Sequence, residues 1–448
     1  MSAKLPLCLL ASMALPIFAL AQDQPTPKTD EFFIHDGDMP VVFLGDSITE
    51  QKMYSTLIEA YTLSRFPTWK VNFRNVGWSG DRAELSSRGG VDFDGNFQRD
   101  VLTLQPKAIT IDYGMNDARG GDTYYKRFIE YSTKLVENSK KAGARVALLT
   151  PSPEEKYEDD APAGSHYNLM LKKYADGLKE IADKENVLFI DQLTPFINFI
   201  DEGRKAGILS KTEPPKGDKD FEQRLMWGDI HPNWGGHLIM ATVILQGMHA
   251  PALVSSVSLD AEARSTIATE KCTIEWQEAP HGVVQFKRTD ETLPWPTVAE
   301  GDVALKIPGF DPATALNLYT LKVSNLKEPS YKLSIDDKNF ATYSNTDLAA
   351  GVNLSSVREG PIYDQAQRLL RAIMQKNKDF YHRWREVQLA PSPAKPKDGA
   401  TDASDSADSA RTAELARLDG VIADDEKAID ALRHPIPHIF RLEPVSTK

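Results

Sequence analysis

Four short polar blocks, far apart in the chain, contain the residue types that nucleophilic acyl transfer requires. They are, in chain order, GDS (45–47), GWSGD (77–81), GMND (114–117) and GDIHPN (228–233). Acyl transfer needs a hydroxyl that attacks the acyl carbon, an imidazole that takes its proton, a carboxylate that orients the imidazole, and N–H donors that receive the oxyanion. The blocks supply a candidate for each of these parts.

The residue types assign the roles. Ser47 follows an apolar run and begins a helix-like stretch, so it is the candidate nucleophile, placed where a helix N-terminus favours developing negative charge. His231 is the candidate base, and Asp229 is the candidate acid that orients it. The backbone N–H groups of Ser47 and Gly80 and the side-chain amide of Asn116 form the candidate oxyanion hole. We expect glycine at position 80 because a Cβ would obstruct the approach of the backbone to a substrate.

Each of these residues also has a purely structural interpretation. Ser47 could simply cap a helix, and Asn116 and Gly80 could serve turns. The neighbouring acids Asp46 and Asp117 are expected to bond the backbone of their loops. The joint occurrence of all four blocks favours the catalytic interpretation over these alternatives.

The elements that must position these residues are predicted by the hydrophobic pattern. The runs VVFL (41–44), AITI (108–111), RVALLT (145–150) and NVLFID (186–191) are typical of buried strands, and residues 124–142 and 169–184 of amphipathic helices. Strands that alternate with helices predict a parallel sheet covered on both faces, and hence a three-layer α/β/α sandwich with right-handed crossovers. Ligands bind beyond the carboxyl ends of such strands, which is where the polar blocks lie.

The pattern changes after Val254. Short alternating segments predict a small all-β unit: CTIEW (272–276), GVVQFKR (282–288), DVALKI (302–307), LYTLKVSN (318–325) and SYKLSI (330–335). From Ile362 the periodicity is helical. A second helix is predicted over residues 411–433 and is expected to pair with the first as a hairpin. The Pro-, Ser- and Asp-rich segment between them has too little apolar surface to fold, so a disordered loop is expected at about 391–410.

The N-terminal 21 residues have the features of a secretory signal peptide. Lys4 supplies a basic region, residues 5–20 an apolar region, and Ala19-Leu20-Ala21 a cleavage site. A transmembrane anchor is the alternative, which the short run and its two prolines disfavour. After cleavage the chain keeps only Cys272, so no internal disulfide is expected. We therefore expect a secreted or periplasmic protein with the organisation 1–21 signal peptide, 30–254 catalytic domain, 255–360 β-rich accessory region and 361–448 helical hairpin.

Composition excludes some partners. The 448-residue chain has a formal net charge of −12, which argues against nucleic acid and against docking on anionic lipid. No second segment is long and apolar enough to span a bilayer. His237, six residues after His231, lacks nearby partner ligands for a metal and is expected to pack or cap. The sequence therefore predicts no metal and no organic cofactor, and it leaves the oligomeric state open.

The four blocks, in this order, resemble the motifs of the SGNH (GDSL) hydrolase family, named for the Ser, Gly, Asn and His within them. The resemblance covers about residues 40–250, roughly half of the chain. The segments FRNVGWSGD and IDYGMND look like a secreted bacterial subgroup often found in planctomycetes, and DLAAGVNL, RWREVQL and PHIFRLEP are similar to its C-terminal extension. The resemblance implies a flavodoxin-like fold and metal-free serine ester hydrolysis. The chain has no Gly-x-Ser-x-Gly elbow, which removes the main support for an ordinary α/β-hydrolase.

One block departs from the family pattern. The family usually spaces its acid and base as Asp-x-x-His, whereas here Asp229 precedes His231 by two residues and Gly228 occupies the usual acid position. Asp229 could still reach the imidazole through a local adjustment of the backbone. Otherwise a backbone carbonyl could orient His231, which would leave a catalytic dyad.

The resulting hypothesis is a secreted serine esterase that removes O-acyl groups, most simply acetyl groups, from carbohydrate. Trp78, Tyr113, Met115 and Trp234 adjoin the blocks and could line a substrate pocket or pack in the core. One alternative is a lipase, lysophospholipase or thioesterase of the same family. Another is a catalytically weak carbohydrate-binding or scaffold protein, for which the shortened Asp/His spacing is the one supporting feature.

Overall fold

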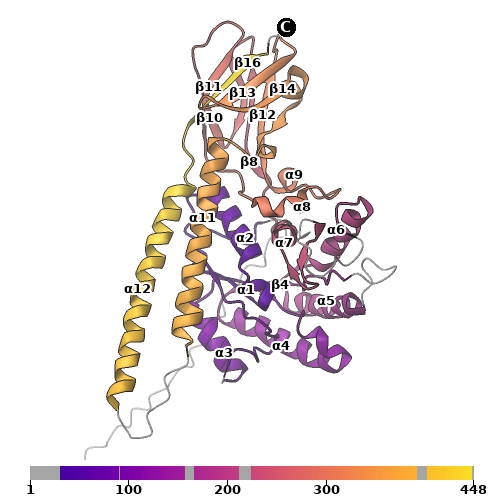
Figure 1. The fold of residues 1–448 in the computed structure, drawn as a ribbon, viewed down its shortest axis with the longest axis vertical. Coiled ribbons are helices and arrows are strands. Elements are labelled where there is room, and N and C mark those ends of the chain that lie inside the picture. The colour runs from indigo at the N-terminus through magenta and orange to yellow at the C-terminus, as the bar shows by residue number, and fades with distance from the viewer. Residues whose placement is uncertain (1–30, 90, 157–165, 211–222, 391–400, 446–448) are drawn as a thin grey trace, which may run out of the picture. The chain divides into compact units, whose positions relative to one another are not determined.

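The structure is a computed structural model that describes residues 31–89, 91–156, 166–210, 223–390 and 401–445 (Figure 1). The expected signal peptide at 1–21 and the first half of the expected loop at 391–410 lie outside the described residues. The chain from Phe32 onward folds as one unit. The boundaries expected near residues 254 and 360 mark changes of architecture inside that unit.

The N-terminal part is built on a five-stranded parallel sheet in the order β2-β1-β3-β4-β5. Its strands are β1 (Val41–Gly45), β2 (Phe73–Asn75), β3 (Ala108–Asp112), β4 (Arg145–Leu149) and β5 (Leu188–Ile190). Every residue of β1 and β3 is buried, which explains their largely apolar sequences. The strand order is that of flavodoxin-like sheets, with the switch point between β1 and β3. The predicted α/β fold is confirmed.

Helices cover both faces of this sheet. The larger ones are α2 (Met53–Arg65), α3 (Phe93–Asp100), α4 (Gly121–Lys141), α5 (His166–Glu185), α6 (Leu193–Lys205) and α7 (Trp234–Gly247). Helices α2 and α7 pack on each other, as do α4 and α5, and Figure 1 shows the two pairs on opposite sides of the sheet. All residues of α2 are buried because a further helix, α11, covers its outer side. Short elements near the polar blocks are α1 (Ser47–Glu50), η1 (Leu102–Leu104), η2 (Ala118–Gly120), β6 (Met226–Trp227) and β7 (His231–Pro232).

Two further sheets make up the β-rich region. One has the order β10-β11-β16-β13-β14 and the other β15-β12-β8-β9. Their strands are β8 (Leu253–Asp260), β9 (Ser265–Glu270), β10 (Cys272–Trp276), β11 (Val284–Asp290), β12 (Leu318–Ser324), β13 (Ser330–Ile335), β14 (Lys338–Ser344), β15 (Val352–Asn353) and β16 (His438–Pro444). The remaining short helices are η4 (Ala299–Gly301), α8 (Asp302–Leu305), α9 (Pro312–Leu316), α10 (Asn345–Ala350) and η5 (Leu354–Ser356).

Two expectations for this region were wrong. Residues 302–307, expected as a strand, begin with the helix α8, because adjacent Val303 and Ala304 are both buried in the region where α8 packs on α7. The tail after the predicted helix at 411–433, which was assigned to the helical hairpin region, contains β16, which pairs with both β11 and β13 in the middle of its sheet.

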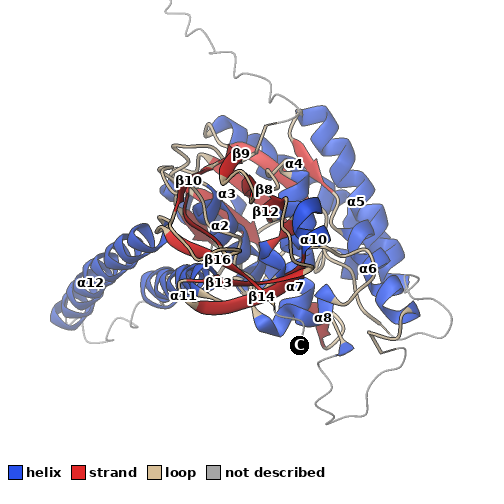
Figure 2. Ribbon diagram, turned by 90° about the horizontal axis from the view of Figure 1, so that it is seen from above, coloured by secondary structure: helices blue, strands red, loops and turns tan. Residues whose placement is uncertain are grey.

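The expected helical hairpin is present. Helix α11 (Pro361–Tyr381) continues into a π-helix, η6 (His382–Gln388), and α12 (Thr401–Arg433) packs alongside α11 (Figure 2). Helix α12 begins ten residues before the predicted position, within the segment expected to be disordered. A buried ion pair of 2.7 Å between Lys376 of α11 and Glu59 of α2 joins the hairpin to the sheet domain.

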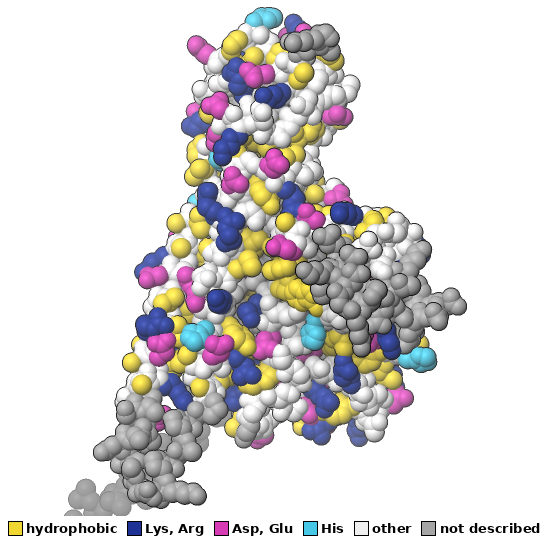
Figure 3. All heavy atoms as spheres, viewed as in Figure 1, with side chains coloured by type: hydrophobic (Ala, Val, Ile, Leu, Met, Phe, Trp, Pro, Cys, Tyr) yellow, Lys and Arg dark blue, Asp and Glu magenta, His cyan; other side chains and the backbone are white. Residues whose placement is uncertain are grey.

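The described surface carries no large patch of one charge sign on the face shown in Figure 3, where basic and acidic side chains are interspersed. Within the described ranges, no helix is both long and apolar enough to cross a membrane. The same residues contain no cluster of three or more side chains able to hold a metal ion.

Candidate active site

Ser47 lies directly beyond the carboxyl end of β1. Strand β1 ends at Gly45, where an added Cβ would come within 2.2 Å of Thr49 Oγ1 and 2.7 Å of the Asp112 carbonyl oxygen. The Asp46 carboxylate then caps α1 by accepting a hydrogen bond from the Ile48 N–H at 3.0 Å. This confirms the predicted structural role of Asp46 and places Ser47 as the first residue of α1.

His231 lies next to Ser47. Its Nε2 is 2.9 Å from Ser47 Oγ, although the two residues are 184 positions apart in the sequence. His231 belongs to β7, which pairs with β6 in a short hairpin. Burial, followed by the positive charge of Arg119, lowers the pKa of His231. The imidazole is therefore held toward its neutral form, which can accept the proton of a hydroxyl.

Asp229 has other partners. Its Oδ1 is 3.3 Å from Arg224 Nη2, and its backbone carbonyl accepts a hydrogen bond from the Glu155 N–H at 2.8 Å. Its side chain is 41% exposed. Among the described residues it makes no hydrogen bond to His231. The turn starts at Gly228, whose positive φ of 62° favours glycine. The structure thus brings Ser47 and His231 together but places the Asp229 carboxylate against Arg224.

The two remaining oxyanion candidates come from neighbouring loops. Gly80 has a φ of 73°, and a Cβ added there would meet no atom within 4 Å. Its backbone conformation, rather than crowding from the protein, therefore accounts for the glycine. Asn116 Nδ2 donates to the backbone carbonyl of Asp81 at 2.9 Å and to Asp46 Oδ2 at 3.3 Å. The side-chain amide of Asn116 thus lies between the loop of Ser47 and the loop of Gly80.

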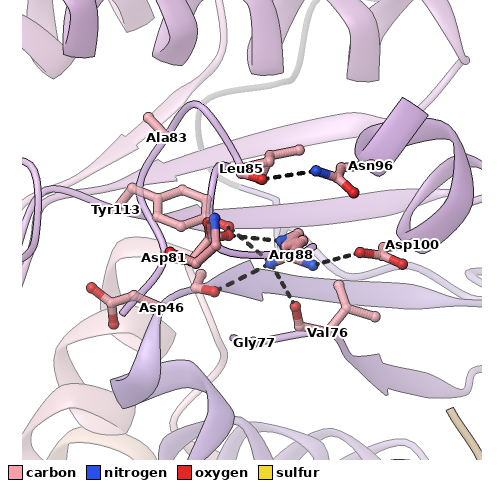
Figure 4. Close-up of polar contacts among 12 residues, drawn as sticks. Asp46, Val76, Gly77, Asp81, Ala83, Leu85, Arg88, Asn96, Asp100 and Tyr113 are labelled. Carbon is pink, nitrogen blue, oxygen red and sulfur yellow. Dashed lines mark hydrogen bonds and ion pairs between the residues drawn. The ribbon is translucent and has the colours of Figure 1, made fainter. Parts of the chain in front are cut away.

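A buried arginine, Arg88, joins the strand ends that carry these loops (Figure 4). Its Nε donates to Asp81 Oδ2 at 2.7 Å and its Nη1 to Asp100 Oδ2 at 3.2 Å. Its Nη2 donates at 2.9 Å to the Val76 carbonyl, beyond β2, and to the hydroxyl of Tyr113, beyond β3. All three charged side chains are 0% exposed. The position of the Gly80 loop is therefore fixed by charge-assisted hydrogen bonds out of contact with water.

Several buried carboxyl groups surround the same strand ends. Burial, reinforced by the nearby Asp112, raises the pKa of Asp46 well above its ordinary value. Burial raises the pKa values of Asp112 and Asp117 to about 7. Asp117 Oδ1 accepts a hydrogen bond from the Ala83 N–H at 3.2 Å, which confirms its predicted loop-supporting role. The raised pKa values limit the negative charge beside the place where an oxyanion would form.

Other polar and aromatic candidates have structural roles. His237 is buried, and its Nε2 is 2.9 Å from Gln51 Oε1, so the expectation of a packing role is confirmed. Burial lowers the pKa of His237 to about 3. Trp78, Tyr113 and Met115 are at most 8% exposed, so they pack in the core. No local pattern indicates the role of Arg88, because its four partners come from separate segments that meet only in the folded chain.

The comparisons with known proteins agree with this architecture. Residues 43–239 match the model of the GDSL-like lipase/acylhydrolase family. An acetylxylan esterase of Geobacillus stearothermophilus is 23% identical over 230 residues, which are 46% of this chain and 92% of that protein. The solved structure of a gut microbial diltiazem-metabolizing enzyme superposes with a TM-score of 0.71 at 21% identity and covers 92% of this chain and 99% of that one. The crystal structure of the Geobacillus esterase Axe2 covers 49% of this chain and 97% of its own, with 22% identity and a TM-score of 0.37.

The fold and the ordered blocks define a flavodoxin-like α/β hydrolase domain with a C-terminal extension. The domain of residues 43–239 is thus a GDSL-like acylhydrolase domain of the SGNH type, and together with the esterase relative it supports an esterase activity for the chain. The likeness to the diltiazem-metabolizing enzyme extends beyond the matched domain, so the β-rich region and the helical hairpin are shared features of fold.

Proposed function

We propose that the protein hydrolyses O-acyl esters, most simply acetyl esters of carbohydrate, with Ser47 as nucleophile and His231 as general base. The observation that carries this proposal is the 2.9 Å contact between Ser47 Oγ and His231 Nε2 at the carboxyl end of the parallel sheet. A base within hydrogen-bond reach of a hydroxyl is the geometry that activates a serine.

The proposed reaction has two halves. His231 takes the proton of Ser47 as its Oγ bonds to the acyl carbon, and the carbonyl oxygen becomes an oxyanion. The N–H groups of Ser47 and Gly80 and the amide of Asn116 stabilise this charge, with Asn116 giving up its longer contact to Asp46. His231 then returns the proton to the departing alcohol, which leaves an acyl-enzyme. Water, activated by His231, releases the acid and restores Ser47.

The mechanism also depends on which group, if any, orients the His231 imidazole. Asp229 can serve as the triad acid only if its carboxylate leaves Arg224, 3.3 Å away, and turns to the imidazole. We therefore propose that His231 and Ser47 act as a dyad in the conformation described. The Asp229→Asn substitution distinguishes the dyad from the triad.

The acetyl-carbohydrate substrate is supported by the acetylxylan esterase relative, which is 23% identical over 230 residues. Export through residues 1–21 is part of the same proposal, because polymeric carbohydrate is encountered outside the cell. N-terminal sequencing of the mature protein tests the cleavage after Ala21.

The catalytic assignment is tested by labelling the folded protein with a fluorophosphonate and by assaying nitrophenyl acetate. We expect the wild type to label and to turn over, and Ser47→Ala to do neither. Ser86→Ala, which removes an exposed hydroxyl in the same part of the chain, is the matched control and should behave as the wild type. A wild type that does not label, or labelling that survives Ser47→Ala, contradicts the assignment.

The substrate class is tested separately. Acetate release is measured from acetylated xylan and other acetylated glycans, with Ser47→Ala as background, alongside nitrophenyl esters of increasing chain length. Release from a glycan with a preference for acetyl supports the proposal. A strong preference for long acyl chains would instead favour a lipase or thioesterase.

A further inference from the structure

The C-terminal helical hairpin reaches the candidate active site from outside the matched catalytic domain. Helix α11 runs along the outer side of α2, and its last residue, Tyr381, is followed at once by the π-helix η6. Both elements lie more than a hundred residues beyond position 239, where the family match ends. π-Helical turns are rare and are frequently found at functional sites.

Glu50 is the first point of contact. It is the last residue of α1, three positions after Ser47, and one carboxylate oxygen accepts a hydrogen bond from the Ser79 N–H at 2.9 Å and contacts the Ser79 hydroxyl. The other carboxylate oxygen accepts a hydrogen bond from the Tyr381 hydroxyl at 2.9 Å. One carboxylate therefore connects the nucleophile helix, the residue before Gly80 and the end of α11.

Trp78 is the second point of contact. The guanidinium carbon of Arg385, in η6, lies 3.4 Å from the centre of a Trp78 ring, and Trp384 meets Trp78 edge-on with ring centres 6.1 Å apart. Arg385 Nε is also 3.9 Å from Glu50 Oε1, within ion-pair distance. A partly buried guanidinium over an indole is a favourable cation–π contact. Both residues that precede Gly80 are thus held by the C-terminal segment, directly or through Glu50.

The hairpin is a firm support for these contacts. Lys376 Nζ pairs with Glu59, and the adjacent Asn377 donates to Thr56 Oγ1 and to Glu59, each at 3.0 Å. These bonds are buried and lie about one helical turn before Tyr381. Burial, reinforced by the bond to Glu50, raises the pKa of Tyr381 to about 12, so its hydroxyl stays protonated and can donate.

We propose that Tyr381 and Arg385 are positioning residues that hold the Trp78-Ser79-Gly80 backbone at the separation from Ser47 that oxyanion stabilisation requires. The C-terminal segment then completes an active site whose reacting groups all lie in the catalytic domain. This inference rests on the proposed esterase activity. Catalysis is sensitive to such placement, since a displacement of about 1 Å can cost about a hundredfold in rate.

The test compares Tyr381→Phe and Arg385→Ala with matched controls on the same elements. Tyr363→Phe removes a hydroxyl at the start of α11, and Arg383→Ala removes an η6 guanidinium that pairs with Asp419 of α12. We expect the two test variants to lower kcat on nitrophenyl acetate by tenfold to a hundredfold, with KM within about twofold and unchanged thermal unfolding. The controls should keep the wild-type kcat. Arg385→Lys should recover part of the loss because it restores a cation near Trp78.

A double-mutant cycle distinguishes positioning from a general structural role. Glu50→Gln and Tyr381→Phe should each lower kcat, and their combination should lower it no further than the worse single variant, since both break the same connection. Fully additive losses, or test variants that fold and keep kcat within twofold, overturn the proposal. The proposed function fails separately, if the wild type neither hydrolyses esters nor labels at Ser47.

Discussion

The two sides of the candidate active site are held in different ways. On the oxyanion side, the loop Gly77–Asp81 is fixed by Arg88 and Asp81, both fully buried, and by Glu50. On the base side, His231 is half-buried in a two-stranded hairpin, and Asp229 beside it is 41% exposed. The rigid part is thus the one that must meet developing charge without rearrangement, whereas the base needs only to reach the hydroxyl. The oxyanion loop is therefore the more tightly held of the two sides, and it is the side where a rearrangement during the reaction would cost the most free energy.

Replacement of Arg88 should have the largest effect on the tightly held oxyanion side. Arg88→Met leaves the buried Asp81 without its cation and leaves Asp100 with Arg99 alone, and removing one partner of a buried pair costs about 3–5 kcal/mol. We expect a matching fall in the free energy of unfolding in urea. Arg127→Met, at an ion pair whose arginine is 55% exposed, is the control and should change stability by at most about 1 kcal/mol. Equal effects of the two variants would show that the buried ion pairs of Arg88 hold the Gly80 loop no more firmly than an exposed ion pair would.

Asn116→Ala should have the next largest effect. It deletes a side-chain donor proposed for the oxyanion, and loss of one such donor lowers kcat by about 10²–10³-fold. The measurement is kcat on nitrophenyl acetate, with thermal unfolding as the check on folding. A loss confined to KM would show that Asn116 binds the substrate without acting on the transition state.

Asp229→Asn should have a much smaller effect. If the carboxylate stays with Arg224, kcat should fall by less than about tenfold, compared with about 10⁴-fold for the same change in a Ser-His-Asp triad. Asp176→Asn, an exposed acid on α5, is the control. A loss near 10⁴-fold in Asp229→Asn alone would establish a triad and place the base side under the same tight control as the oxyanion side.

The smallest expected effect is a change in pH dependence. Burial and the charge of Arg119 hold the pKa of His231 below its ordinary 6.5, so the neutral base persists to lower pH and kcat/KM should rise with pH below that value. Arg119→Gln removes one of the two causes, so the acid limb should move to higher pH. Arg127→Gln should leave it in place. An unchanged limb in Arg119→Gln would show that burial alone sets this pKa.

The sequence was sufficient to predict the parallel sheet and the proximity of Ser47 and His231. Strands of a covered parallel sheet are continuous apolar runs, and polar residues after them must share one edge. In β16, buried residues (His438, Phe440 and Leu442) alternate with less buried ones. This alternation is typical of a strand, but the segment was assigned to the helical hairpin because a long predicted helix precedes it.

Other features had no local signal. Tyr381 and Glu50 bond across 331 positions, so nothing near either residue indicates the contact. Asp229 and His231 lie two residues apart, yet the carboxylate pairs with Arg224 because side-chain direction in a turn depends on tertiary partners. The spacing of residues in the sequence could therefore identify candidate residues of the site but could not determine which of them are in contact.

The place of β16 between β11 and β13 has a consequence for biogenesis. A polypeptide halted before residue 438 would leave two facing strand edges unpaired, and unpaired edges invite association between copies. The β layer can close only after the hairpin has been synthesised and has turned back. Completion of the β layer is thereby tied to the translation of a segment nearly four hundred positions downstream of Ser47.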